Sequence, residues 1–428
     1  MHNALLKGFA LAALAAAVSG CCSFTDAPRP YPPAPCGDYD FVSMFDGETF
    51  RCWQGDVAAL TVEQHPYTCW YGPKTKKVLC HSDANAMVLT AKDAPVALTS
   101  RKTYEDFVFR FLYAPSKGCL GRVGFTDVDG RNGWSVPLKD ELPAKDRAAW
   151  NCVEVRLVAD RLVVMFNGFI VRDEQVEPAK RPGMGRVMLG ADRGTLKFLA
   201  PRVKRVAPNW TPDGCPCLNR ALEGFTALFD GKSLDGWKGV TRTEGFNSPW
   251  VRRAARPEKR AEIQAIADRQ MVEHWSVRDG ALFFDGKEGG YSLATAKDYG
   301  DFEMWCDWRI LTLAGDSGFY PRGVCQVQIW DAHHMWHLGS GGLYNNKEHP
   351  RHGLEIADRQ PGDWNRCYLK MVGNRVTVKL NGVTVVDDTE LENAAVNKHP
   401  GPIPAIEQLE LQCHGDPLEF RNIFIREL

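Results

Sequence analysis

The stretch Arg375-Val-Thr-Val-Lys-Leu-Asn-Gly382 decides the fold. Apolar and polar side chains alternate along its first six residues, as they do in a β-strand with one buried face. The Asn-Gly pair that follows favours a tight turn into a second antiparallel strand, because both residues tolerate a positive φ angle. Leu409-Glu-Leu-Gln-Cys-His414 alternates in the same way. These patterns predict an all-β protein.

The sequence contains the same unit twice. Trp150-Asn-Cys-Val-Glu-Val-Arg156 returns as Trp364-Asn-Arg-Cys-Tyr-Leu-Lys370, and Val163-Val-Met-Phe-Asn-Gly168 returns as Thr377-Val-Lys-Leu-Asn-Gly382. The step from 150 to 364 equals the step from 163 to 377, so both pairs are in one register. Shorter matches keep the same order: Phe41–Gly47 with Phe225–Gly231, each followed by a tryptophan (Trp53 and Trp237), and Tyr104–Phe107 with Tyr299–Phe302. We therefore expect a duplicated domain.

The duplication sets the domain boundaries. Proline and cysteine cluster between Pro208 and Asn219, so we place a linker at 208–222, a first domain at 37–207 and a second at 223–428. Each is long enough for one β-sandwich. Helical periodicity is clear once, from Pro257 to Glu273, where Ile263, Ile266, Ala267 and Met271 form an apolar stripe and Pro257 suits a first helical turn.

The N-terminus is typical of an exported lipoprotein. Lys7 precedes an apolar run from Phe9 to Val18, and small residues lead to Cys21, which would be lipidated once residues 1–20 are removed. The alternatives are an ordinary cleaved signal or an uncleaved membrane helix, although the run is short for a bilayer. Five prolines between Thr25 and Pro35 favour an extended tether over 21–36. We predict a lipid-anchored protein of the bacterial cell envelope.

Composition narrows the class of partner. The formal net charge of −1 argues against nucleic acid. The 13 tryptophans favour a carbohydrate partner, or else they fill the cores of the sandwiches. Of the 14 cysteines, 13 remain without Cys21, so at least one thiol is unpaired within the chain. Cys69 and Cys80 could bridge a hairpin and Cys215-Pro-Cys217 sits in the linker, but no spacing indicates a zinc site.

The second unit carries a series of motifs in a fixed order: Phe229-Asp-Gly-Lys-Ser-Leu-Asp-Gly-Trp237, Trp275-Ser-Val-Arg-Asp-Gly280, Asp316-Ser-Gly318, Gln326-Val-Gln-Ile-Trp-Asp331, Gly339-Ser-Gly-Gly-Leu-Tyr344, Trp364-Asn365, Leu380-Asn-Gly382 and His414-Gly-Asp-Pro-Leu-Glu-Phe-Arg-Asn-Ile423. In these residues, over roughly 225–428, it resembles the 3-keto-disaccharide hydrolase domain family, and the first unit resembles a diverged copy. The resemblance implies two tandem concanavalin A-like jelly-roll β-sandwiches, with one helical insertion in the second. It also implies cleavage of glycosides oxidised at C3 of a sugar ring.

A ketone at C3 changes the chemistry that a glycosidase needs. The ketone acidifies the C2 proton, and the glycosidic oxygen on C1 is then β to the resulting enolate. Removing that proton expels the leaving group, and water adds afterwards. The site needs a base near C2, a cation or hydrogen-bond donor at the C3 oxygen and a donor for the leaving oxygen. It does not need the paired carboxylates of ordinary glycosidases.

The candidate residues follow from strand alternation and from the resemblance. Gln326 and Gln328 share one face of a strand, and Gln412 and His414 share one face of another, opposite Leu409, Leu411 and Cys413. Such a polar face lines a wet cleft, or it is a plain solvent-exposed face. The predicted catalytic residues are His414, Asp331, Arg322 and Gln328, with His414 as base or metal ligand and Arg322 at the C3 oxygen. The predicted substrate-binding residues are Gln326, Gln412, Trp330, Tyr344, Asp316 and Asn422.

Two points stay open in the sequence. Asp331 precedes His333, His334, His337 and His349, but no tight ligand spacing supports a metal site. We assign no cofactor, although a divalent metal ion would suit the chemistry. Many members of the resembled family carry a glutamate at the position of Gln326, and glutamine cannot act as a base. The alternative to an enzyme is therefore a lipoprotein that binds carbohydrate without cleaving it.

The first unit lacks the polar set. Counting back from Phe198 and from Phe420 in parallel, His414 aligns with Asp192, Gln412 with Gly190 and Asn422 with Ala200. The first unit keeps residues that make the fold, such as Trp150 and Asn167-Gly168. We expect a non-catalytic copy that acts as a sugar-binding module, a spacer or a packing partner.

Overall fold

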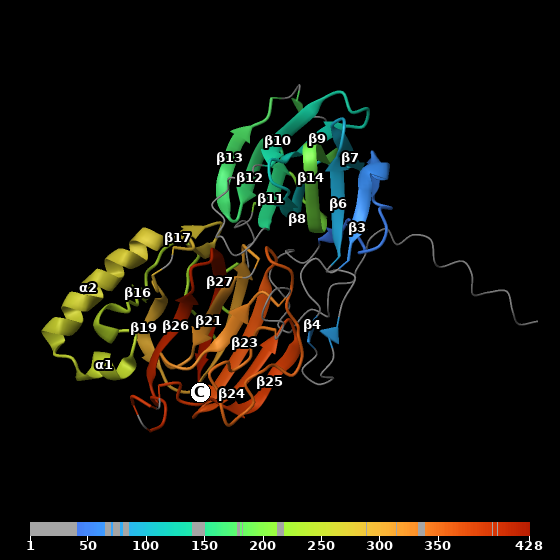
Figure 1. Cartoon of the computed structure of the whole chain (residues 1–428). Coiled ribbons are helices and arrows are strands. Elements are labelled where there is room, and N and C mark those ends of the chain that lie inside the picture. Colours follow the sequence, from blue (N-terminus) through green and yellow to red (C-terminus); the bar gives the residue numbers. More distant parts are fainter. Residues whose placement is uncertain are drawn as a thin grey trace, which may run out of the picture.

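The computed structural model describes residues 41–64, 70–71, 78–79, 85–138, 150–177, 180–181, 183–211, 218–287, 289–313, 315–332, 339–395, 397–399 and 401–428. The predictions for the signal peptide, Cys21, the tether, Cys69, Cys80, Cys215 and Cys217 concern residues outside these ranges. The described chain forms two β-sandwiches, built from the strands between 42 and 205 and between 226 and 427, here called the first and second units (Figure 1). No helix among the described residues is long and apolar enough to cross a membrane.

The first unit consists of two antiparallel sheets that share one strand. The larger sheet runs β3 (Leu60–Glu63), β6 (Ala86–Ala91), β14 (Gly185–Arg205), β8 (Phe107–Pro115), β11 (Asn151–Val158), β12 (Arg161–Phe166) and β13 (Phe169–Gln175), with β1 (Val42–Ser43) on β14. The smaller sheet runs β2 (Trp53–Gly55), β7 (Val96–Ser100), the first part of β14, β9 (Leu120–Asp127) and β10 (Gly133–Leu138). A separate pair is formed by β4 (Trp70–Tyr71) and β5 (Val78–Leu79), and η1 (Val57–Ala59) precedes β3.

The second unit repeats this plan with separate strands. Its larger sheet runs β17 (Trp275–Arg278), β18 (Ala281–Phe284), β27 (Leu418–Glu427), β20 (Phe302–Ile310), β23 (Asn365–Val372), β24 (Arg375–Leu380) and β25 (Val383–Glu390), with β15 (Thr226–Ala227) on β27. Its smaller sheet runs β16 (Trp237–Gly239), β19 (Leu293–Tyr299), β26 (Glu407–Cys413), β21 (Asp316–Tyr320) and β22 (Val327–Trp330). Apolar side chains from both sheets pack between them, as in the first unit.

The Asn-Gly turns confirm the repeat at atomic detail. Asn167 and Asn381 both have a positive φ, 49° and 50°. The Asn167 side-chain oxygen accepts a hydrogen bond from the backbone N–H of Cys152, and the Asn381 oxygen accepts one from Arg366, each at 2.9 Å. The two donors are separated along the chain by the same step as the two asparagines. In both units this side chain therefore accepts a hydrogen bond from a backbone N–H at the start of the neighbouring strand, while its own backbone forms the turn.

The predicted helix is present as an insertion in the second unit. Helix α2 (Pro257–His274) follows α1 (Pro249–Ala254) and η4 (Thr243–Gly245) and lies along the flank of the sandwich beside β16 (Figure 1). It buries Ile263, Ala267 and Met271. Gly239 permits this packing, because a side chain there would collide with the backbone of α2 at Ala267.

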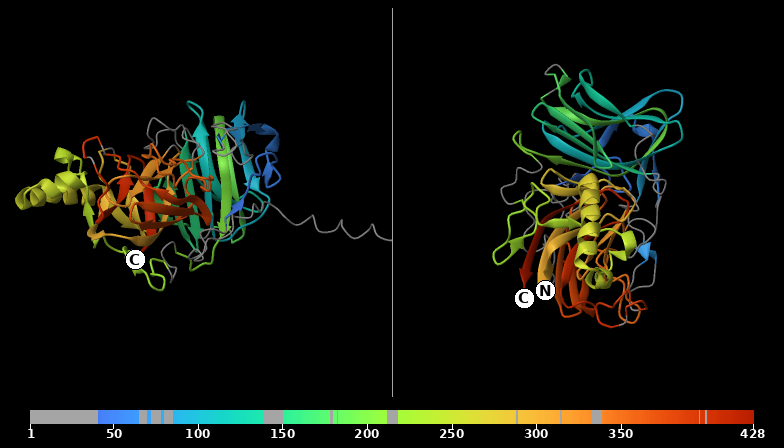
Figure 2. Two further views of the ribbon diagram at one scale, coloured as in Figure 1. Left: turned by 90° about the horizontal axis from the view of Figure 1, so that it is seen from below. Right: turned by 90° about the vertical axis from the view of Figure 1, so that its left-hand side faces the viewer.

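The two units are in direct contact (Figure 2). Trp150, Cys152 and Leu199, on the outer face of the first unit's larger sheet, share an apolar cluster with Leu313 of the second. A β-bridge joins Asn151 to Thr312. The contact therefore places the outer face of one sheet against one end of the other sandwich.

Buried charges cross this contact. Glu154 of β11 binds Arg110 and Arg156 of its own unit and Arg309 of β20 in the second, the last at 3.4 Å. Burial alone would raise the pKa of Glu154, but the three arginines hold it well below its usual range. On the other side Arg309 also binds Glu419 of β27. A buried network of this kind is costly to disrupt, because each loss leaves a charge without its partner.

Candidate active site

The polar face of the second unit's smaller sheet is the candidate site. On β26, Leu409, Leu411 and Cys413 enter the core, so Gln408, Glu410 and Gln412 face the other way. The register then places Gln412 opposite Gly318, and Gly318 opposite Gln328. Glu410 lies opposite Tyr320. The alternation that predicted a polar face for Gln412 and His414 is thus present in the structure.

A chain of amide hydrogen bonds crosses this face. Gln326 Nε2 donates to Gln412 Oε1 at 2.6 Å, and Gln412 Nε2 donates to the Tyr320 hydroxyl at 3.1 Å. Gln326 reaches across the sheet because the intervening residue is Gly318, whose Cβ would lie 2.6 Å from Gln326 Nε2. Gln326 therefore orients Gln412, and Gln412 in turn orients Tyr320.

A second chain ends at His414. Gln328 Nε2 donates to Asp316 Oδ1 at 2.6 Å, and His414 Nδ1 lies 3.7 Å from Asp316 Oδ2. His414 follows β26 in the short segment before β27, and its side chain is 42% exposed. The Asp316 backbone is itself anchored by Asp416, which accepts a hydrogen bond from its N–H at 3.2 Å. A histidine held beside a carboxylate and open to solvent has the arrangement of a general base.

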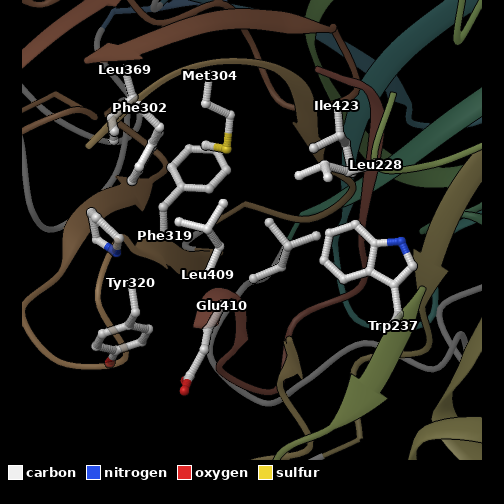
Figure 3. A pocket seen from close by; sticks show the side chains of 12 residues that line it. Leu228, Trp237, Phe302, Met304, Phe319, Tyr320, Leu369, Leu409, Glu410 and Ile423 are labelled. Carbon is white, nitrogen blue, oxygen red and sulfur yellow. The ribbon is translucent and has the colours of Figure 1, made fainter. Parts of the chain in front are cut away.

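A pocket of about 390 Å³ adjoins the first chain. Glu410, Gln412 and Tyr320 contribute to its lining. Its other walls come from the insertion that carries α1 and from loops near 290, 324 and 395. Figure 3 shows the apolar space between the two sheets, with the Glu410 carboxyl and the Tyr320 hydroxyl pointing away from it on the same side.

Glu410 is the residue of this pocket that the sequence reasoning missed. Glu410 is only 4% exposed, and burial raises its pKa to about 7. Arg252 and a 2.7 Å hydrogen bond from Gln408 act in the opposite direction, because both favour the charged carboxylate. Burial, and then the charge of Glu410, raise the pKa of Tyr320. The missed signal was available, because strand alternation places Glu410 on the same face as Gln412.

Comparison with known proteins identifies the second unit. Residues 224–426 match the sequence profile of the family described as the 3-keto-alpha-glucoside-1,2-lyase-like domain. The second unit is a 3-keto-alpha-glucoside-1,2-lyase-like domain. This match confirms the resemblance of the second unit to that family. The comparison with curated proteins returned no significant match.

Several solved structures are similar to parts of the chain. An inferred glycosyl hydrolase from Parabacteroides distasonis is 21% identical, with 49% of this chain and 99% of that chain covered and a TM-score of 0.33. A second one from the same organism is 24% identical over 36% and 91% of the two chains, with a TM-score of 0.30. The β-glucanase of Bacillus licheniformis is 10% identical over 39% and 97%, with a TM-score of 0.25.

The aromatic candidates of the lyase-like domain lie beside the polar face. Trp330 is buried, and its indole N–H donates to the Gly339 carbonyl at 2.8 Å. Its ring meets Tyr344 edge to face, with 5.5 Å between centroids. Asp331 is also buried, and its backbone N–H donates to Gly315. These three residues thus cluster at the end of β22, next to Asp316, which pairs with Trp330.

Two predicted site residues of the lyase-like domain lie elsewhere. Arg322 is 1% exposed, and its guanidinium donates to the carbonyls of Pro404 and Gly300 at 2.9 and 2.8 Å. Asn422 belongs to the larger sheet, where it donates to Asp307 and exchanges hydrogen bonds with Asn219. Both predictions are corrected, because these side chains hold loops and strands together and do not reach the polar face.

The structure does not test whether a metal ion binds near Asp331. His333, His334 and His337 lie outside the described residues, whereas His349 pairs with Glu392 at 3.0 Å. Among the residues that the structure does describe, no three histidine, cysteine, aspartate or glutamate side chains gather into a metal site.

Proposed function

We propose that the lyase-like domain cleaves the glycosidic bond of 3-keto glycosides by removing the C2 proton and eliminating the group on C1. Water adds to the unsaturated product in a later step. The observation that carries this proposal is the polar face of β21, β22 and β26, in a domain matched to this family. Two hydrogen-bonded chains lie on this face, and a sugar-sized pocket adjoins the first of them. No pair of carboxylates is required for such an elimination.

His414 is the base in this proposal. Its imidazole can accept the C2 proton, and Asp316 beside Nδ1 stabilises the imidazolium that forms. Gln328 keeps the Asp316 carboxylate in place by donating to its other oxygen. His414 thus acts on the substrate, while Asp316 and Gln328 are positioning residues.

Gln412 and Tyr320 supply the donors. The Gln412 amide carries two N–H groups, and only one of them is used by Tyr320, so the second can donate to the C3 oxygen as the enolate forms. The Tyr320 hydroxyl accepts from Gln412, which leaves its own proton for a ligand oxygen in the pocket. Gln326, in the place of a glutamate, holds this arrangement through its bond to Gln412.

The second candidate function is carbohydrate binding without cleavage. Gln326 favours it, because an amide cannot take a proton from carbon. The two functions are separated by incubating the full chain with a 3-keto glucoside and with the unoxidised parent glucoside. Release of aglycone from the keto compound alone supports cleavage. Saturable binding of either compound without release supports the second candidate and overturns the first.

We further propose that the chain is exported and anchored in the bacterial envelope through lipidated Cys21, where it meets its carbohydrate substrate. A short apolar run before Cys21 and a proline-rich segment after it support this location. Labelling with radioactive palmitate should mark the full chain, and Cys21→Ser should lose the label and move the protein out of the membrane fraction. Retained label in Cys21→Ser would overturn the anchor.

A further inference from the structure

The pocket beside Glu410 carries charges that the proposed elimination does not use. Arg242 and Lys398 both line it. No carboxylate of the described residues lies within 4.0 Å of either cation, although most arginines of this unit are paired. Two cations that line one pocket without such a partner attract a negatively charged ligand.

Arg242 is held at the pocket by its surroundings. It lies against Gly290, where an added Cβ would come within 2.7 Å of its Nε atom. Burial raises the pKa of Tyr320 and of Cys413, and the positive charge of Arg242 offsets part of each rise, which places the guanidinium close to the floor formed by β21 and β26. His399 lines the same pocket and is stacked on Trp250, with 4.7 Å between ring centroids. The wall that carries the cations is thus built from packed side chains.

The floor of the pocket does not cancel these charges. Glu410 is its acidic residue, and the pKa of Glu410 is raised to about 7 by burial. The groups around Glu410 are Arg252, which pairs with Glu407 and lies 3.7 Å from Glu410 itself, together with Glu407, Lys238 and Tyr320. Below pH 7 the carboxyl is mostly neutral and can donate a hydrogen bond to an anion instead of repelling it.

The separation between Glu410 and His414 indicates that the pocket holds a different part of the substrate from the ring on which His414 acts. Glu410 and His414 are four residues apart along extended chain, which is about 13 Å at roughly 3.3 Å per residue. One sugar ring does not reach both side chains. We propose that the pocket binds a carboxylate on the group linked to the 3-keto sugar, so the natural substrate is an anionic glycoside. This inference rests on the proposed function, since it names the leaving group of that reaction.

Two matched substrates test the inference. The full chain is assayed with the 3-keto glucosides of 4-hydroxybenzoate and of 4-hydroxybenzamide, which differ in charge but hardly in size. We expect kcat/KM to be about tenfold higher for the carboxylate, the effect of one charge-assisted hydrogen bond. Arg242→Gln and Lys398→Gln should each bring the ratio of the two kcat/KM values, carboxylate over amide, toward one. Arg242→Lys should retain most of the preference for the carboxylate. Arg161→Gln, which changes an exposed side chain at the start of β12 in the first unit, is the control for removal of a positive charge.

The outcomes separate this inference from the proposed function. Equal rates on the two substrates, or an unchanged ratio in Arg242→Gln and Lys398→Gln, overturn the anionic ligand while the elimination stands. If neither substrate is cleaved, the proposed function fails, and calorimetry with the two unoxidised glucosides decides the pocket. Binding of the carboxylate alone, weakened by salt and lost in Arg242→Gln, supports it. Equal binding of both, or of neither, overturns it.

Discussion

The two units share a frame and differ in what covers one face of it. Every strand of the second unit's smaller sheet has a counterpart in the first, in the same order. On β14 the positions of Glu410, Gln412 and His414 are taken by Met188, Gly190 and Asp192, as the alignment through Phe198 and Phe420 predicts. The positive φ of Ala200, 47°, and of Asn422, 52°, confirms that this alignment holds on the following strand.

The first unit fills the face that the second keeps open. Arg122 stands where the second unit has Gly318, and its side chain lies over Gly190 and pairs with Asp192. Met188 covers Gly124, which occupies the position of Tyr320. Within its described residues the first unit also lacks the helical insertion that walls the pocket. A site on this fold therefore depends on a few residues of one face and on one insertion, while the frame persists without them.

The largest expected effect is on kcat, when His414 and its counterpart Asp192 in the first unit are each replaced. His414→Ala should lower kcat for a 3-keto glycoside about 10³-fold, the usual loss for a general base. The aligned substitution Asp192→Ala should leave kcat unchanged, because Asp192 is paired with Arg122 in the unit without the polar set. Circular dichroism should show both variants folded, since both side chains are partly exposed. Full activity in His414→Ala would remove His414 from the base role.

The contact between the units gives the next effect. Glu154→Gln should lower the free energy of unfolding by about 3–5 kcal/mol, because Arg110, Arg156 and Arg309 lose the charge that compensates them. Asp173→Asn, which breaks an exposed pair with Arg161, should cost about 1 kcal/mol or less. Urea unfolding of the full chain measures both. If Glu154→Gln costs no more than Asp173→Asn, the three buried arginines do not depend on the charge of Glu154.

Glu410 is ionisable and its counterpart Met188 is not, so the stability of the second unit should depend on pH through this position. The pKa of Glu410 is about 7 in the folded chain and near 4.5 when unfolded, so folding opposes its ionisation. Stability from this group is complete below pH 4.5 and is lost as the pH rises through 7. Glu410→Gln should therefore gain up to about 3 kcal/mol on wild type between roughly pH 5 and pH 8. Parallel stability curves for the two proteins would contradict this assignment.

The Asn-Gly turns should give the smallest and most similar effects. Asn167→Ala and Asn381→Ala each lose buried hydrogen bonds and force a positive φ on alanine, which should cost about 2 kcal/mol in either unit. Asn167→Gly and Asn381→Gly keep the backbone conformation and should cost less. Urea unfolding of the four variants measures these costs. A large loss in one unit with almost none in the other would mean that the turns no longer have the same role.

Local patterns predicted the frame and only part of the site. The turn at Asn381, the stripe of α2 and the polar face with Gln412 are all set by neighbours in sequence, so alternation and turn chemistry suffice to predict them. Glu410 follows the same alternation, but its burial comes from the insertion and from loops far along the chain. Arg242 lies between β16 and η4, where no periodic pattern singles it out.

Arg322 shows the opposite failure. The residue closely follows β21 and a site motif, which made it a plausible partner for the C3 oxygen. Its direction is decided by the carbonyls of Pro404 and Gly300, which come from distant loops. The direction of a side chain beyond the end of a strand depends on such contacts, and these are not visible in the sequence.

The buried charges between the units also bear on how the chain can evolve. A duplicated copy is ordinarily free to be deleted when its sister folds alone. Here deletion would strip Arg309 of its partner Glu154, and an apolar patch around Leu313 would be left exposed. Once such a contact has formed, the first unit is retained because the folding of the second depends on it. The duplication is therefore easy to acquire and hard to reverse, because the two units come to share buried contacts.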